Sequence, residues 1–259
     1  MTAGPRALHI TTSGRGPGVC FLHPIGLSGA FWHETIGELS DAFSCYSVDL
    51  RGHGASPWDG APFALRDLAR DVLESLPGEP MLVVGCSMGG MVAQELALLA
   101  PARARGLVLS NSTGRVPPAA RPALEARAQA SLADPASSAE QAVSRWFAPD
   151  FVRTEPQRTA AIETRLLDTD PHVIACGWRA IADFDVETRL ADLPSPALVV
   201  TGTADSSTSP AAARAHAALF SRGESQFVEG AGHLTPYERP RMFASLIRRF
   251  VAELQDEQR

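Results

Sequence analysis

Short aliphatic runs alternate with longer stretches of helical spacing along most of the chain. Residues 65–76 and 91–99 repeat apolar side chains at helical intervals, and residues 240–254 do so near the C-terminus. Strands that alternate with helices predict an α/β fold with a mainly parallel sheet. The runs expected as strands are 19–22, 45–50, 81–84, 107–109, 197–201 and 225–229.

Polar or glycine-rich clusters follow most of the expected strands. In an open α/β sheet, the loops after the carboxyl ends of the strands form the binding site. We therefore expect the functional residues in these loops. They read His23-Pro-Ile-Gly, Arg51-Gly-His-Gly, Gly85-Cys-Ser-Met-Gly-Gly, Asn111-Ser-Thr-Gly and Gly202-Thr-Ala-Asp.

The strand pattern is interrupted after residue 114 and resumes at Ala197. The intervening composition turns to Ala, Arg, Glu and Gln with several prolines, which predicts a helical insertion. We therefore expect a core domain made of residues 1–112 and 191–259. A helical cap, residues 113–190, is expected to follow the strand near residue 109 and to lie over the loops that it interrupts.

Residues 81–100 are nearly long and apolar enough to suggest a membrane span. Glycines in the middle break the run, and Gln94 and Glu95 would be costly in lipid, so a strand, a turn and a buried helix fit better. Residues 1–6 show no basic stretch before an apolar core, as a secretory signal would have. We expect a cytoplasmic protein with no membrane partner.

Composition narrows the class of function. The chain has 259 residues, 45% of them hydrophobic, and a formal net charge of −6. A net negative charge with scattered arginines argues against nucleic acid as a partner, because a nucleic-acid binder needs a basic surface. No lysine is present, which excludes Schiff-base chemistry and lysine-bearing phosphate loops. The partner expected is a small-molecule substrate.

Four cysteines lie far apart and never form a C-x-x-C pair. This spacing favours reduced, mostly buried thiols over a zinc site or a disulfide framework. Nor do histidines or carboxylates show a metal-ligand pattern: His33-Glu34, for example, lacks a second histidine at metalloprotease spacing. We expect no metal and no dinucleotide cofactor. The cysteines are Cys20, Cys45, Cys86 and Cys176.

The pattern Gly85-Cys-Ser-Met-Gly89 follows an expected strand and precedes an expected helix. A G-x-S-x-G in this position is typical of a nucleophile elbow, a sharp strand-to-helix turn that exposes a serine hydroxyl. Glycines two residues before and after the serine leave room for the turn. We predict Ser87 as a nucleophile; the alternative is a glycine-rich structural turn.

A serine hydroxyl is a weak nucleophile, so it needs a base and an acid that orients the base. His233 lies in a glycine-rich loop between the last expected strand and the terminal helix, and Asp205 follows the strand 197–201. The order Ser87, Asp205, His233 is the one expected for an elbow on a parallel sheet. Taken singly, a loop His or Asp is more often a surface residue or a helix cap.

Backbone N–H groups are the expected donors to the oxyanion of a tetrahedral intermediate. We predict Met88, directly after the nucleophile, as one donor. The other is expected from the loop after residues 19–22, where Ile25 is the candidate because Pro24 has no N–H. His23 is expected to shape this loop rather than act as a second base.

Asp49 and Arg51 follow another expected strand in the sequence Asp-Leu-Arg-Gly-His-Gly. An acid and a base at a glycine-rich strand end suggest chemistry, but they can equally pair with each other and shape the turn. We favour the structural interpretation.

Together, HPIG, DLRGHG, GCSMGG, the strand end at 202–205 and GAGH resemble the α/β-hydrolase fold family over essentially the whole chain. Within that family the chain is most similar to the 3-oxoadipate enol-lactonases, through residues 145–151, 180–185 and 230–240. The resemblance implies a mostly parallel central sheet flanked by helices and a cofactor-free serine hydrolase. It also implies opening of an enol-lactone in aromatic-ring catabolism by way of an acyl-enzyme.

In a lactonase, Ser87 would attack the lactone carbonyl, His233 would take the proton and Asp205 would steady the imidazolium. The carboxylate of such a substrate needs a cationic partner, which in a lysine-free chain is arginine or backbone N–H. The alternative is that cap arginines only solvate helices. The candidates for contact with substrate are Arg127, Arg145, Arg179 and Trp146.

Three alternatives stay open. A carboxylesterase or perhydrolase-like enzyme would use the same triad with a more apolar pocket, and lyase chemistry can use the same Ser and His. A receptor on this fold would bind a small molecule without turning it over. Dehalogenase and epoxide-hydrolase chemistry is excluded, because those relatives have an Asp where this chain has Ser87. The oligomeric state is left open.

Overall fold

A computed structural model describes residues 7–256. Residues 1–6, on which the expectation of no secretory signal rests, lie outside the described residues, as do 257–259. Seven strands form one sheet in the order β1-β3-β2-β4-β5-β6-β7, with β1 antiparallel to β3 and all other neighbours parallel. The strands are β1 (Ile10–Ser13), β2 (Gly18–Leu22), β3 (Ser44–Val48), β4 (Met81–Cys86), β5 (Ala104–Ser110), β6 (Ala197–Gly202) and β7 (Gly223–Val228).

The central strands are buried because helices cover both faces of the sheet. Every residue of β4 and of β6 is buried, which explains why both read as continuous aliphatic runs. All six expected strands are present, and the expected α/β fold with a mostly parallel sheet is confirmed. The edge strand β1 was not predicted, because its four residues are only partly buried and contain no apolar run.

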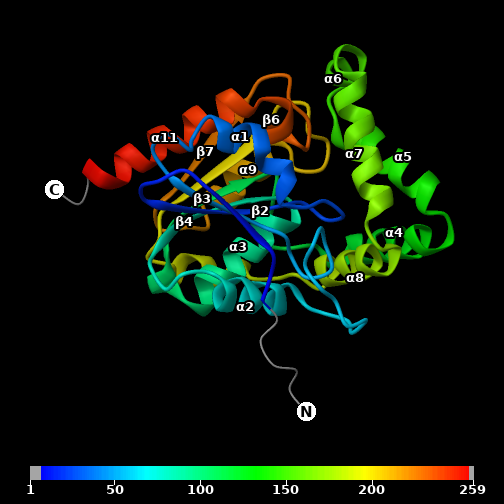
Figure 1. Cartoon of the computed structure of the whole chain (residues 1–259), viewed down its shortest axis with the longest axis horizontal. Helices are drawn as coiled ribbons and strands as arrows, with labels where there is room; N and C mark the ends of the chain where they lie inside the picture. The colour runs from blue at the N-terminus through cyan, green and yellow to red at the C-terminus, as the bar shows by residue number, and fades with distance from the viewer. Residues whose placement is uncertain (1–6, 257–259) are drawn as a thin grey trace.

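Two layers of helices enclose the sheet (Figure 1). The helices α1 and α11 pack together on one face, and α2 and α3 pack together on the other. Helix α9 packs on β6 and β7 and is joined to α3 by a 3.0 Å hydrogen bond between His216 and Gln94. These helices are α1 (His33–Gly37), α2 (Leu65–Ser75), α3 (Met88–Leu99), α9 (Pro210–Ala217) and α11 (Pro240–Asp256), and the short α10 (Thr235–Glu238) precedes α11.

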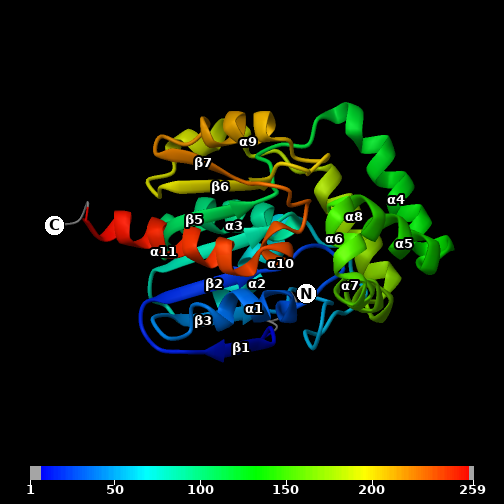
Figure 2. The same ribbon diagram turned by 90° about the horizontal axis from the view of Figure 1, so that it is seen from above.

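Five helices lie between β5 and β6 in the sequence and gather at one end of the molecule (Figures 1 and 2). They occupy the segment 113–190 that is predicted as a cap, and we call them the cap helices. The division of the chain into two domains stays a prediction. The cap helices are α4 (Arg121–Ala133), α5 (Pro135–Trp146), α6 (Pro149–Thr154), α7 (Pro156–Asp168) and α8 (Pro171–Ala182).

The apolar stretch 81–100 consists of β4, a turn at Ser87 and α3, as its glycines predict. Within residues 7–256, no helix has both the length and the apolar character that crossing a membrane requires.

Candidate active site

Ser87 lies in a sharp turn between β4 and α3. Its φ of 53° is in the left-handed region, which non-glycine residues rarely adopt, so the backbone there is strained. A Cβ at Gly85 would collide with the backbone of Gly89, and one at Gly89 would collide with the carbonyl of Leu22. Both glycines are therefore required for the strand and the helix to approach this closely. Because the turn is so tight, α3 begins at Met88, three residues before the expected start.

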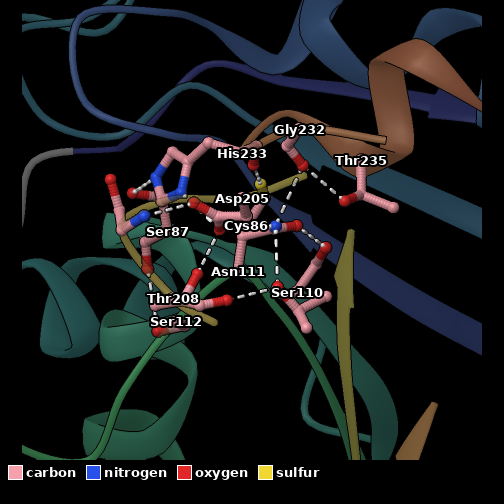
Figure 3. Close-up of polar contacts among 12 residues, drawn as sticks. Cys86, Ser87, Ser110, Asn111, Ser112, Asp205, Thr208, Gly232, His233 and Thr235 are labelled. Atoms are coloured by element: carbon pink, nitrogen blue, oxygen red, sulfur yellow. Dashed lines mark hydrogen bonds and ion pairs between the residues drawn. The ribbon is translucent and has the colours of Figure 1, made fainter. Parts of the chain in front are cut away.

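The structure brings the three predicted triad residues together (Figure 3). Nε2 of His233 lies 3.0 Å from Oγ of Ser87, and its Nδ1 lies 2.9 Å from Oδ2 of Asp205. His233 is 7% exposed and Asp205 is 4% exposed, so the hydrogen bond between them is shielded from water, while Ser87 is half-buried. The arrangement can transfer a proton from the serine to the histidine while the aspartate fixes the imidazole tautomer.

The pKa of Asp205 lies well below the usual range. Burial alone would raise it, but the charge of His233 and hydrogen bonds from His233, Thr208 and Asn111 outweigh burial. Asp205 is therefore held as a carboxylate, which can stabilise a positively charged imidazole.

Asn111 and Thr208 hold the carboxylate of Asp205, a role that the sequence analysis missed. Nδ2 of Asn111 donates to Oδ2 of Asp205 at 2.9 Å, and the Thr208 hydroxyl donates to the same oxygen. The Ser110 hydroxyl in turn donates to Oδ1 of Asn111 at 2.6 Å, so the amide is fixed from both ends (Figure 3). Asn111 has a φ of 50°, which Asn tolerates better than most residues. Its place directly after β5 was the only signal in the sequence.

The predicted oxyanion donors lie at two different backbone turns. Met88 is the first residue of α3, where a helical N–H has no acceptor within its own helix. Ile25 is buried in the loop after β2. In α8, a Cβ at Gly177 would lie 2.8 Å from Cδ1 of Ile25, and Sδ of Met88 is also within contact distance. The cap thus closes directly over both residues.

Two buried histidines shape the loop that carries Ile25. His23 donates from Nδ1 to the carbonyl of Pro24 at 2.7 Å, and its Nε2 accepts from the N–H of Leu50 at 2.9 Å. Nε2 of His53 accepts from the N–H of Gly26 at 3.1 Å. Burial is the main cause that lowers the pKa of His23 to about 3 and that of His53 to about 4. Both rings are therefore neutral supports, as expected for His23, while the role of His53 was not predicted.

Asp49 and Arg51 make hydrogen bonds to different partners. Asp49 accepts from the N–H of Gly29 at 2.7 Å and from that of Ala55 at 2.9 Å. Arg51 makes two 2.7 Å hydrogen bonds to Asp71 in α2. The prediction that both residues shape structure agrees with these contacts.

The cap contacts the loop that carries His233. The N–H of His233 donates to the carbonyl of Trp146 at 2.6 Å, and the two rings stack with centroids 6.5 Å apart. Oε1 of Glu238 accepts from the N–H of Gly232 at 2.9 Å, and burial raises the pKa of Glu238 to about 7. Trp146 thus lies beside the triad, and Glu238 supports the loop that carries His233, a role that the sequence did not predict.

The three candidate arginines of the cap have different surroundings. Arg179 is bound to Glu125 on the exposed side of α4 and α8, with nitrogen–oxygen distances of 3.0 to 3.3 Å. Arg127 and Arg145 are half-buried and line a pocket together with Trp146. The structure therefore separates Arg179 from the other two candidates.

The sheet and the elbow geometry are those of the serine hydrolases, and comparison with known proteins gives the same class. The model of the alpha/beta hydrolase family matches residues 21–246. The chain belongs to this family. The expected class of enzyme, a hydrolase of ester or lactone bonds, is confirmed.

Three relatives illustrate the range of the similarity. The 3-oxoadipate enol-lactonase 2 of Acinetobacter baylyi is 28% identical over 94% of this chain and 92% of its own length. The pimeloyl-[acyl-carrier protein] methyl ester esterase of Yersinia pseudotuberculosis is 32% identical over 92% of this chain and 95% of its own length. The structure of a thermophilic esterase from Thermogutta terrifontis, solved with malate bound, superposes with a TM-score of 0.90 at 26% identity. The match covers 98% of this chain and 96% of the esterase. The expected likeness to enol-lactonases is confirmed, and the likeness extends equally to esterases.

Proposed function

We propose that the protein hydrolyses a small carboxylic ester or lactone through an acyl-enzyme formed on Ser87. The observation that carries the proposal is the continuous chain of hydrogen bonds from Ser87 through His233 to Asp205, at 3.0 and 2.9 Å. A chain of this kind removes the serine proton as the hydroxyl attacks a carbonyl.

In the first half-reaction, Oγ of Ser87 bonds to the carbonyl carbon and its proton passes to Nε2 of His233. The oxyanion accepts hydrogen bonds from the N–H groups of Ile25 and Met88. The bond from the carbonyl carbon to the leaving oxygen then breaks, and the imidazolium returns the proton to that oxygen. In the second half-reaction, His233 takes a proton from water, the hydroxide attacks the acyl carbon, and Ser87 regains its proton as the acid leaves.

The substrate that we propose is 3-oxoadipate enol-lactone or a related lactone. The proposal is supported by the similarity to the Acinetobacter baylyi enol-lactonase across nearly the whole of both chains. Opening of an enol-lactone releases an enol that tautomerises to a ketone, which draws the reaction forward. A role in aromatic-ring catabolism, in the cytoplasm, is part of this proposal.

The second candidate is a general carboxylesterase. It is favoured by the 32% identity to a methyl ester esterase, and it needs the same triad and oxyanion donors. The two candidates differ in the substrate that fits beneath the cap helices, not in the chemistry at Ser87.

The test is the spectrophotometric loss of 3-oxoadipate enol-lactone with purified protein, with a short-chain aryl ester as comparison. Fast lactone turnover that Ser87→Ala abolishes is the expected result. Turnover of the aryl ester alone, again abolished by Ser87→Ala, assigns the protein as an esterase. Activity that survives Ser87→Ala, or binding of either compound without turnover, overturns the proposed mechanism.

A further inference from the structure

A pocket lies among the cap helices α4, α5, α7 and α8. Its wall includes Ile25, from the oxyanion loop, and Trp146, whose ring stacks on His233. Through these two residues the pocket adjoins the surroundings of the triad. Much of the rest of the wall is apolar, with Ala139, Ala142, Leu166, Ile174 and Trp178 among its residues.

Two arginines, Arg127 from α4 and Arg145 from α5, interrupt this apolar wall. Within residues 7–256, neither guanidinium makes a hydrogen bond or an ion pair with another side chain, and no acidic side chain lines the pocket. Arg127 instead lies over the ring of Trp178, 5.2 Å from its centroid, which fixes its direction. The pocket thus contains two positive charges and no negative charge from the protein.

The positive charges of Arg127 and Arg145 repel each other. Burial lowers the pKa of both groups, and the charge of Arg127 further lowers the pKa of Arg145. Two half-buried cations without a counter-charge are unfavourable, because desolvation and mutual repulsion both raise their energy. An anion in the pocket would relieve both costs.

We propose that Arg127 and Arg145 form a carboxylate-binding subsite, so that the enzyme acts on esters and lactones whose acyl part carries a second, free carboxylate. This inference rests on the proposed function and narrows it to anionic substrates. It adds an activity that lactone chemistry alone does not imply: half-esters of dicarboxylic acids are substrates, and the matching neutral diesters are poor ones.

A carboxylate suits the site because a guanidinium presents a planar fork of N–H donors that matches its two oxygens. The apolar wall would pack against the methylene groups that join this carboxylate to the scissile carbonyl at Ser87. Arg179 provides the contrast, since it belongs to the same cap but is already paired with Glu125.

The experiment compares monomethyl adipate with dimethyl adipate, which differ only in one free carboxylate. The proteins are the wild type, Arg127→Gln, Arg145→Gln and the control Arg179→Gln. We expect the wild type to prefer the half-ester in kcat/KM by at least about tenfold, as expected for hydrogen bonds to a charged group. Arg127→Gln and Arg145→Gln should each lose about tenfold or more on the half-ester and little on the diester. Arg179→Gln should keep both activities.

Diester turnover serves as the check on folding in every variant, because it does not need the subsite. Equal losses on both esters, or a wild type with no preference for the half-ester, overturn the carboxylate subsite while leaving ester hydrolysis intact. Failure of the wild type to hydrolyse either ester or the enol-lactone is a different result, because it overturns the proposed function itself.

Discussion

The backbone N–H of His233 donates a 2.6 Å hydrogen bond to the carbonyl of Trp146, the last residue of α5. The loop that carries the proposed base is therefore held by the cap as well as by the sheet. Asp205 holds the opposite side of the same imidazole at 2.9 Å. A change in the cap at this point is transmitted to the proton-transfer geometry without touching the triad itself.

Gly232→Ala tests this contact between cap and loop. A Cβ at this position would lie 2.6 Å from the carbonyl oxygen of Trp146 and from the nitrogen of Ala148, both of them backbone atoms. We expect kcat to fall by about tenfold or more and stability to fall by about 1–3 kcal/mol, as for other overpacked sites. Gly78→Ala is the control, since a Cβ there meets no atom within 4 Å. Equal ester hydrolysis and melting temperature in the two variants would contradict the contact.

Asn111→Gly removes the amide that holds Asp205. Glycine readily adopts the φ of 50° that the backbone has at this position, so the turn itself is preserved. The carboxylate loses one hydrogen bond from a neutral donor, which for a charged acceptor contributes about 1.5–3 kcal/mol. We expect kcat to fall by about tenfold or more with KM nearly unchanged, because the amide orients the triad and lies away from the pocket. Steady-state kinetics on one ester measure this split. A wild-type kcat would show that Thr208 and His233 suffice.

Asp205→Asn leaves the shape of the triad and removes its negative charge. The imidazole then loses the partner that fixes its tautomer and stabilises its charged form, so kcat should fall by about 10³–10⁴-fold. Thermal unfolding of the variant checks that the fold is retained. A fall of less than tenfold in a folded variant would remove Asp205 from the proposed mechanism.

Glu238 makes stability depend on pH. Burial raises its pKa in the folded state to about 7, above the 4.5 of the unfolded chain. The folded protein therefore binds more protons than the unfolded chain between these values, and stability falls as pH rises from about 4.5 to 7. The contribution of this one group over that range is at most about 3 kcal/mol.

Glu238→Gln isolates this effect, because the amide oxygen can still accept the N–H of Gly232 while the side chain no longer titrates. Urea unfolding at pH 5 and pH 8 should show a smaller loss of stability in the variant than in the wild type. Identical losses in the two proteins would mean that Glu238 is already ionised in the folded protein at pH 5, so that burial does not raise its pKa.

The site residues that could be predicted from the sequence are those whose role follows from their position directly after a strand. Ser87 follows from a glycine pattern between a strand and a helix, and Asp205 and His233 follow from their positions after later strands. Parallel strands bring their carboxyl ends to one edge of the sheet, so three loops far apart in sequence meet there.

The residues that the sequence missed act through tertiary contacts. Asn111 supports Asp205, which is 94 residues away, and His53 supports Gly26, which is 27 residues away. The three cap arginines look alike in sequence. Only the structure distinguishes them, because it shows that Arg179 of α8 forms an ion pair with Glu125 of α4. The weak strand β1 was missed for another reason, since its pattern is short and half-exposed.

The central claim, an acyl-enzyme on Ser87, is tested most directly by trapping it. Protein mixed with an aryl ester, quenched in acid within the first turnover and analysed by mass spectrometry should carry one acyl group. Digestion should place that group on the peptide containing Ser87, and Ser87→Ala should carry none. An acyl group on another residue such as Cys176, or ester turnover that persists in Ser87→Ala, would contradict the account.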